Sequence, residues 1–231
     1  LVGDDAHRLA VHTGKADDDV LGIVRGDFEE VTIVDRLEHK LLHVVGLVRV
    51  VGHQGVQAQI GPIDGMVWLA GVYTPMPADR LDVAAFAQMC DVNFTGCARV
   101  LGAVLPAMVA RGAGHIVLTG SLSGFRGLPG AMGYQASKAG VMALAECLYA
   151  DLRGSGIKVQ VANPGFIRTR LTDKNTFAMP FLMEPYEAAF HMMTLMQGRA
   201  FKKSFPMVFS WLFRLSQFLP DWAYYRMFAP K

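Results

Sequence analysis

The sequence predicts an α/β fold with a doubly wound parallel sheet, and three observations support this prediction. From residue 61 onward, short apolar runs alternate with longer segments in which apolar residues recur every three or four positions. Turns rich in glycine and proline separate these segments. The chain has 231 residues, of which 52% are apolar and 18% are charged, so it can form one large core.

The short apolar runs predict the strands. The first covers Gly65–Ala70 and follows the turn Gly61-Pro62-Ile63-Asp64. The next two cover His115–Thr119 and Ile157–Ala162, and a last strand is expected within residues 200–206. Because a helical segment separates each strand from the next, we expect the strands to be parallel.

The segments with helical periodicity predict four helices, over Val83–Ala110, Met132–Arg153, residues 184–197 and Met207–Leu219. Pro106 is expected to bend the last turns of the first helix. The run Gly154-Ser155-Gly156 is expected to end the second. Residues 177–183, which are rich in Phe and Met, are predicted to form an apolar loop or lid.

Ser121, Tyr134 and Lys138 carry the clearest chemistry. Tyr134 and Lys138 are four residues apart on a predicted helix and therefore share one face. Ser121 directly follows a predicted strand, and its spacing to Tyr134 favours it over the neighbouring Ser123. A nearby ammonium group lowers the pKa of a phenol from its usual value of about 10, so that a tyrosine can act as a general acid or base near neutral pH.

Four motifs, in this order, resemble the short-chain dehydrogenase/reductase family. They are Ala70-Gly71 after a strand, Asn93 in Asp91-Val92-Asn93, the segment from Ser121 to Lys138, and Asn163-Pro164-Gly165-Phe166-Ile167-Arg168-Thr169. The resemblance covers residues 61–231. It implies a Rossmann-like fold with the site at the carboxyl ends of parallel strands, an NAD or NADP cofactor, and a homo-oligomer built on the two long helices.

The resemblance also implies a role for each matching residue. Tyr134 would be the general acid or base, Ser121 would orient the substrate oxygen, and Lys138 would lower the pKa of Tyr134 and hold the nicotinamide ribose. Asn93 would support its helix and a water molecule that connects Lys138 to solvent. The remaining positions expected to contact the cofactor are Ala70, Gly71, Pro164, Gly165, Ile167 and Thr169.

One departure from the family pattern precedes Gly71. The family usually has Asn-Asn-Ala-Gly, whereas this chain has Trp68-Leu69-Ala70-Gly71. Ala70 and Gly71 still allow the backbone to approach the cofactor closely. The missing asparagine side chain removes a hydrogen bond that normally ties the central strand to its neighbour.

Residues 1–60 depart further from the family pattern. The family has Thr-Gly-x-x-x-Gly-x-Gly there, because glycines let backbone N–H groups approach the cofactor pyrophosphate. The nearest segment, Thr13 to Val20, has three consecutive aspartates instead, which would repel a diphosphate. Val31–Val34 is a candidate strand, after which Asp35 or Arg36 would contact the adenosine ribose or its 2′-phosphate; the alternative is a strand end with solvated charges.

The composition changes near the same boundary. All 13 methionines lie at or after Met66, and the net charge is −5 over residues 1–65 but +7 over the rest. We therefore divide the chain into an anomalous N-terminal segment, 1–60, and a single catalytic domain, 61–231. The first segment is expected to mark a fragment or a stretch translated in the wrong frame.

These features support more than one function. The first hypothesis is an NAD(P)-dependent oxidoreductase that interconverts a carbonyl and an alcohol on an apolar small-molecule substrate, such as a lipid or a bulky ketone. The second is a catalytically inactive fragment, or a binding or dimerisation module, that lacks the pyrophosphate-binding loop. A third keeps the fold but performs epimerase or dehydratase chemistry, because those branches also use Tyr-x-x-x-Lys.

The remaining observations concern partners and location. The net charge of +2 shows no nucleic-acid footprint. Cys90, Cys97 and Cys147 lack metal-ligand spacing and are expected to be reduced, mostly buried thiols of a cytoplasmic protein. No run reaches the roughly 18 apolar residues that a spanning helix needs.

The apolar C-terminal tail has two interpretations. It packs in the core or in a dimer, as most apolar helical stripes do. Alternatively, it makes weak contact with a membrane surface, with four basic residues near acidic headgroups, namely Lys202, Lys203, Arg214 and Arg226.

Overall fold

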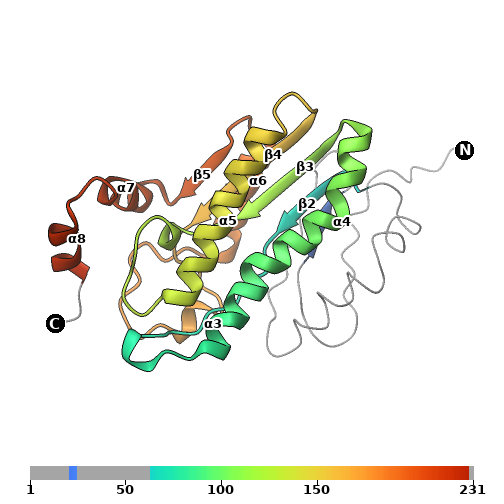
Figure 1. Ribbon diagram of the computed structural model, residues 1–231. Helices are drawn as coiled ribbons and strands as arrows, with labels where there is room; N and C mark the ends of the chain where they lie inside the picture. Colours follow the sequence, from blue (N-terminus) through green and yellow to red (C-terminus); the bar gives the residue numbers. More distant parts are fainter. Residues whose placement is uncertain (1–20, 25–62, 229–231) are drawn as a thin grey trace, which may run out of the picture.

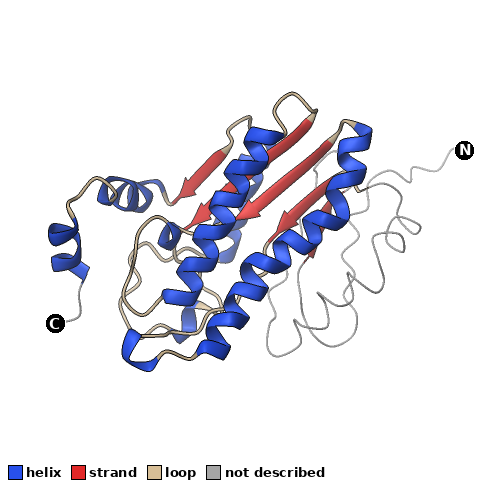
Figure 2. Cartoon of the chain, viewed as in Figure 1, coloured by secondary structure: helices blue, strands red, loops and turns tan. Residues whose placement is uncertain are grey.

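The computed structural model describes residues 21–24 and 63–228, which form a five-stranded sheet in the order β1-β2-β3-β4-β5 (Figure 1). Four strands run parallel: β2 (Gly65–Trp68), β3 (Gly114–Thr119), β4 (Ile157–Pro164) and β5 (Lys202–Phe205). Helices lie on both faces of this sheet (Figure 2). The predicted α/β fold, with its parallel sheet, is therefore confirmed.

Strand β1 (Leu21–Val24) differs from the all-parallel prediction. It pairs antiparallel with β2, with Leu21 opposite Trp68 and Val24 opposite Gly65. An antiparallel strand at the edge of a parallel sheet is common, because antiparallel pairing needs no crossover helix. The predicted strand Val31–Val34, the segment from Thr13 to Val20, and Asp35 and Arg36 lie outside the described residues.

One continuous helix connects β2 to β3 over Val83–Arg111. It consists of α3 (Val83–Cys90), a π-helical turn (Asp91–Thr95) and α4 (Gly96–Arg111). The long helix predicted from the apolar periodicity is thus confirmed, while the π-helical turn was not predicted. Such turns insert one extra residue into a helix and occur often at functional sites.

The other helices follow the predicted order. They are α5 (Met132–Asp151), α6 (Pro185–Gln197) and α7 (Met207–Ser216), and a further helix, α8 (Asp221–Phe228), follows them. Helix α6 begins at Pro185 because proline suits the first helical position, and Glu184 and Glu187 form a capping box there. Helix α8 was not predicted, since the last helix expected from the sequence ended at Leu219.

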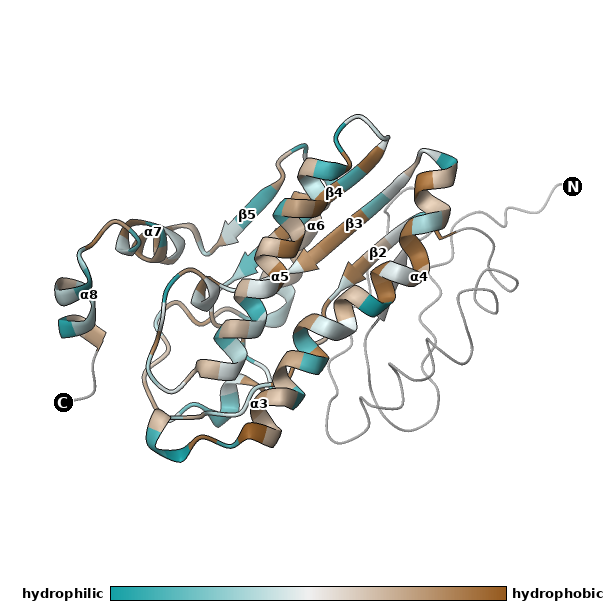
Figure 3. Cartoon of the chain, in the orientation of Figure 1, coloured by the Kyte–Doolittle hydropathy of each residue, from teal (hydrophilic) through white to brown (hydrophobic). Residues whose placement is uncertain are grey.

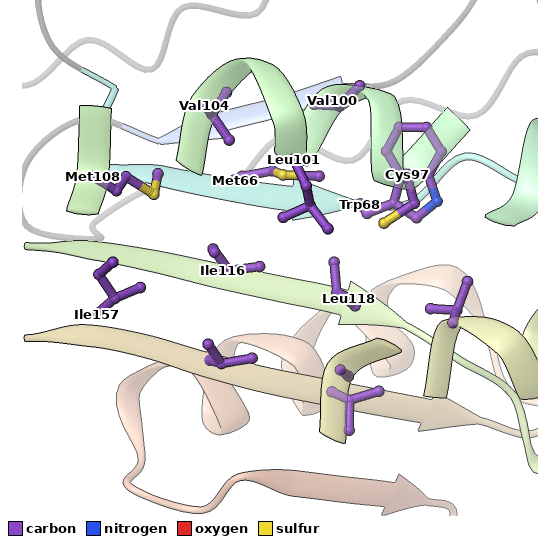
Figure 4. Packing of buried hydrophobic residues seen from close by; sticks show 14 of the residues in the cluster. Met66, Trp68, Cys97, Val100, Leu101, Val104, Met108, Ile116, Leu118 and Ile157 are labelled. Carbon is purple, nitrogen blue, oxygen red and sulfur yellow. The ribbon is translucent and has the colours of Figure 1, made fainter. Parts of the chain in front are cut away.

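The sheet buries alternate residues on its two faces. Met66 and Trp68 of β2 point with Ile116 and Leu118 of β3 toward α4 and α5 (Figure 4). The intervening residues pack against α6 in a second cluster that contains Val67, Val117, Ala162, Met192 and Leu195. Figure 3 shows the apolar character of the central strands β2 and β3. Because both faces of these strands are buried, their sequences are continuous apolar runs.

The helix Val83–Arg111 has the length and hydropathy of a membrane-spanning helix, although no apolar run in the sequence suggested one. Its inward side chains belong to the core, where Val100, Leu101, Val104 and Met108 are almost fully buried against the sheet. A core helix of an α/β domain passes the same test of length and composition. Its packing against the strands explains its apolar character.

The turn after α5 gives a matched pair of glycines to test the packing. Gly154 and Gly156 both have positive φ, at +80° and +82°. A Cβ at Gly154 would meet open space, whereas at Gly156 it would clash with the carbonyl oxygen of Gly112.

We predict that Gly154→Ala costs about 1–2 kcal/mol of unfolding free energy, the strain of a left-handed alanine. Gly156→Ala adds a backbone clash and should cost at least about 3 kcal/mol. Urea denaturation of both variants measures the difference. Equal destabilisation by the two would contradict the described packing of the turn.

Candidate active site

The predicted catalytic side chains come together at the carboxyl ends of the parallel strands. Ser121 follows β3, Tyr134 and Lys138 lie in the first turns of α5, and Asn93 lies in the π-helical turn. Gly71 follows β2, and an added Cβ there would lie 3.5 Å from Lys138 Nζ and 3.7 Å from Asn93 Oδ1. Segments far apart in the sequence therefore meet at one edge of the sheet.

Ser121 forms a hydrogen bond with the hydroxyl of Tyr134. The backbone N–H and the hydroxyl of Ser123 both donate to Ser121 Oγ, at 3.2 Å and 2.9 Å. Ser123 thus holds the serine that contacts Tyr134, and both serines belong to the site. From the sequence alone, Ser121 and Ser123 were alternatives for one position in the site.

Burial dominates the ionisation of Tyr134. Loss of solvent raises the pKa of its phenol to about 12, and the hydrogen bond from Ser121 opposes this only in part. Lys138 Nζ lies 5.8 Å from the centre of the Tyr134 ring. The expected lowering of the Tyr134 pKa by Lys138 is not seen in this structure, where burial of the phenol is the largest cause of the shift.

Lys138 is itself buried, with 3% of its surface exposed. Its ammonium group donates to the carbonyl oxygen of Thr119 at 3.0 Å. Burial lowers its pKa to about 8, so the side chain is still mostly charged at neutral pH. An ammonium has three donors, and this carbonyl occupies one of them.

Asn93 connects three segments of the site. Its Oδ1 accepts from Val72 N–H at 2.7 Å, and its Nδ2 donates to the Val72 carbonyl at 3.0 Å and to Ser137 Oγ at 2.9 Å. Ser137 lies next to Lys138 and donates to the carbonyl of Tyr134 at 2.7 Å. Asn93 is fully buried, so its amide fixes the loop after β2 against the first turns of α5.

Trp68 supplies a contact that sequence reasoning missed. Its indole N–H donates to the carbonyl oxygen of Asn93 at 3.2 Å. Gly96 leaves room for the indole, since an added Cβ would lie 3.3 Å from its ring. The tryptophan that replaces the family's asparagine thus ties β2 to the π-helical turn.

Tyr73 was also missed. Its ring packs edge-on against that of Tyr134, with 5.3 Å between the ring centres. An aromatic residue two positions after Gly71 was the available signal in the sequence. The contact limits the positions that the phenol of Tyr134 can take.

The cofactor positions predicted after β4 follow one another along the same edge. Pro164 is the last residue of β4, and Gly165 N–H donates to the carbonyl of Phe205 at 2.7 Å. Ile167 pairs with Met183, and Thr169 N–H donates to Thr172 Oγ1 at 3.0 Å. These bonds brace the backbone from Pro164 to Thr169.

Two buried polar atoms near these positions have no hydrogen-bond partner among the described residues: Thr119 Oγ1 and Asn163 Oδ1. Lys138, whose ammonium group lies beside Thr119, keeps two further N–H donors that are able to hold the hydroxyl groups of a ribose. The residues therefore fit the nicotinamide end of a dinucleotide. The segment predicted to face the pyrophosphate lies outside the described residues.

Within residues 63–228, no group of three or more His, Cys, Asp or Glu side chains is placed to hold a metal ion. The ionisable groups of the site are instead a phenol and an ammonium. Such a pair can transfer a proton and hold a hydroxyl-bearing ligand.

Arg126 links the loop after Ser121 to the C-terminal helices. Its guanidinium donates to the carbonyls of Ser216 and Leu219, the latter at 2.8 Å, and pairs with Asp221 at 2.7 Å. It also lies over the ring of Tyr224, 4.0 Å from the centre. Sequence reasoning missed this link, because its partners are at least 90 residues away.

Comparison with known proteins agrees with the fold. Residues 47–179 match the sequence profile of the short chain dehydrogenase family, a match that begins before the boundary expected at residue 61. An uncharacterized oxidoreductase of Myxococcus xanthus is 41% identical over 169 residues, which cover 73% of this chain and 66% of that protein. One from Staphylococcus saprophyticus is 31% identical over 189 residues, covering 82% and 76%.

A solved structure shows the same fold. It is a short chain dehydrogenase from Burkholderia cenocepacia in complex with NADP, which aligns with a TM-score of 0.68 over 85% of this chain and 81% of its own. Its sequence identity of 20% supports the fold alone. The parallel sheet, the grouped tyrosine, lysine and serine, and the family match over more than half of the chain lead to one conclusion: this protein belongs to the short chain dehydrogenase family.

Proposed function

We propose that the protein is an NAD(P)-dependent oxidoreductase that interconverts a carbonyl and an alcohol. The single observation that carries the proposal is the meeting of Tyr134, Ser121 and Lys138 at the carboxyl ends of β3 and β4. Relatives that are named oxidoreductases support it. The Burkholderia relative of known structure binds NADP, which supports NADP or NAD here.

Each side chain takes one task in this proposal. In the reductive direction Tyr134 donates its proton to the substrate oxygen, and its raised pKa keeps it in the protonated form that this step needs. Ser121 hydrogen-bonds the same oxygen and stabilises the charge that develops on it. Lys138 binds hydroxyl groups of the nicotinamide ribose, and Asn93 keeps Tyr134 and Lys138 in place.

The cofactor would lie along Ala70, Gly71 and the braced backbone that contains Pro164, Gly165, Ile167 and Thr169. When bound, it supplies the hydride that goes to the carbonyl carbon. Gly71 has no side chain that would block the cofactor, and the turn after Pro164 is held by its own hydrogen bonds. The side chains of the site are therefore free to face the cofactor.

The substrate side is apolar. Phe166 packs against Phe177 and Phe209, with ring centres 5.9 Å and 5.6 Å apart. Phe181 packs against Phe209 at 5.5 Å, so the loop 177–183 and α7 share one aromatic cluster. These rings favour an apolar carbonyl or alcohol. Self-association and a cytoplasmic location complete the proposal.

The alternative is an inactive fragment or a binding or dimerisation module without a pyrophosphate site. Binding of NADPH and NADH, followed by cofactor fluorescence, separates the two. Saturable binding by the folded chain is expected of the oxidoreductase, and no binding of either is expected of the module. Epimerase or dehydratase chemistry would give turnover without net change in cofactor absorbance.

We predict that Tyr134→Phe lowers kcat by at least about a hundredfold, because the proton donor is lost. NADPH binding and the unfolding midpoint should stay near those of the parent chain. Tyr73→Phe is the matched control, since it removes a neighbouring hydroxyl but keeps the ring contact. A Tyr134→Phe variant with parental kcat would exclude the proposed role.

The pH profile tests Lys138. Its pKa of about 8 means that the positive charge is present at pH 7 and is lost as the pH rises through about 8. Tyr134, with a pKa of about 12, stays protonated over that range. We therefore expect kcat/KM for reduction to fall above pH 8.

Lys138→Arg provides the control, because a guanidinium keeps its charge throughout. The fall near pH 8 should be absent in this variant, even if its activity is lower at every pH. A fall that persists unchanged in Lys138→Arg would mean that another group titrates.

A further inference from the structure

Helix α7 turns its apolar face outward. Val208, Trp211, Leu212 and Leu215 are between 52% and 61% exposed, and their spacing places them on one side of the helix. Phe218, at 85%, and Trp222 of α8, at 75%, extend the same exposed set. We call these six residues the C-terminal apolar face. Helices α7 and α8 lie at the end of the molecule beyond β5 (Figure 1).

The inward side of α7 is partly polar. Phe209, Ser210 and Ser216 are buried there, and the two serine hydroxyls donate to carbonyls of their own helix at 2.7 Å and 2.8 Å. An amphipathic helix of a globular protein normally buries its apolar stripe and exposes its polar one. The outward leucine and tryptophan side chains of α7 are the reverse of that arrangement.

Specific contacts fix α7 and α8 in this orientation. Arg126 binds the carbonyls of Ser216 and Leu219 and the carboxylate of Asp221. Tyr224 is fully buried, and its hydroxyl donates to the carbonyl of Gly127 at 2.9 Å. The apolar face is therefore held outward by the loop that follows Ser121.

The charge around this face is positive. Residues 202–228 contain four basic side chains, of which Lys202 is paired with Glu146 at 2.8 Å, and one acidic side chain, Asp221, which is paired with Arg126. Arg226 is exposed and makes no ion pair within the described part of the chain, and Arg214 lies 5.8 Å from the centre of the Trp211 ring. The face thus combines apolar and aromatic side chains with unpaired positive charge.

The positive charge distinguishes between two partners for this face, a second copy of the chain and a lipid bilayer. In a symmetric dimer the same patch meets itself, so Arg214 and Arg226 would approach like charges of the second copy. An anionic bilayer instead attracts basic side chains, while Trp and Phe side chains insert at the level of its headgroups. We propose that the C-terminal apolar face docks on the surface of a lipid bilayer that contains anionic headgroups.

Docking would also bring the lid loop to the bilayer. Phe209 of α7 contacts the ring of Phe181 in the loop 177–183 on one side, and the helix presents Trp211 and Leu212 on the other. An apolar substrate dissolved in the lipid would then lie close to the site. This consequence alone rests on the proposed oxidoreductase function.

Intrinsic fluorescence of the full chain tests the proposal directly. The three tryptophans are Trp68, which is 4% exposed, and the exposed Trp211 and Trp222. With phosphatidylcholine vesicles that contain phosphatidylglycerol, we expect a blue shift and quenching by lipids labelled with doxyl groups. Phosphatidylcholine alone should give a much weaker response. Trp211→Phe combined with Trp222→Phe should remove the signal, because Trp68 is shielded in the core.

Two double variants test the face itself. Leu212→Ser with Leu215→Ser should lower the vesicle partition coefficient at least about tenfold, since both side chains would otherwise leave water. The matched control is Tyr186→Ser with Phe190→Ser, a more exposed apolar pair four residues apart on α6, which should bind vesicles like the parent. Arg226→Gln should weaken binding to anionic vesicles about fivefold.

Three outcomes would overturn the proposal. The first is a folded chain whose tryptophan fluorescence changes with neither kind of vesicle. The second is a loss of vesicle binding in the α6 control that equals the loss in the variant at Leu212 and Leu215. The third is a parent oligomer that the Leu212 and Leu215 substitutions dissociate in lipid-free buffer, measured by light scattering, which would assign the face to contact between copies. Vesicle binding without any oxidoreductase turnover would contradict the proposed function but not the docking.

Discussion

The carboxamide of Asn93 is the contact on which the arrangement of the site depends. It lies in a π-helical turn, fully buried, and holds the loop after β2 through both backbone groups of Val72. Its third hydrogen bond, to Ser137, reaches the helix turn that carries Tyr134 and Lys138. A single side chain thus joins the strand that leads to the expected cofactor positions to the helix that carries the proton donor.

Burial then sets the chemistry of the groups that Asn93 positions. It raises the pKa of Tyr134 to about 12 and lowers that of Lys138 to about 8, and both shifts favour the uncharged form of each group. A site that starts with a protonated phenol is ready to donate a proton to a carbonyl oxygen. Ser121, held by Ser123, opposes the rise at Tyr134 through a hydrogen bond. The same loop continues to Arg126 and so connects the site to α7 and α8.

Much of this arrangement follows from local sequence pattern. The apolar period predicted the strands and helices between residues 65 and 216, because buried strands and amphipathic helices have distinct spacings. The pattern could not show that an extra residue at Asp91–Thr95 makes a π-helical turn, since the apolar stripe passes through it. It also could not show Trp68 bonding to Asn93 or Arg126 bonding to Asp221, which depend on side chains brought together from distant segments. The antiparallel β1 was missed for the same reason, because strand direction is a property of the sheet.

The unfolding free energy of Asn93→Leu tests the central claim most directly. Leucine has nearly the same size but cannot hydrogen-bond, so the N–H and carbonyl of Val72 and the hydroxyl of Ser137 lose their partner. The account predicts a loss of about 2–4 kcal/mol in urea denaturation. A loss below about 1 kcal/mol would mean that these groups find other partners, and that Asn93 does not fix the site.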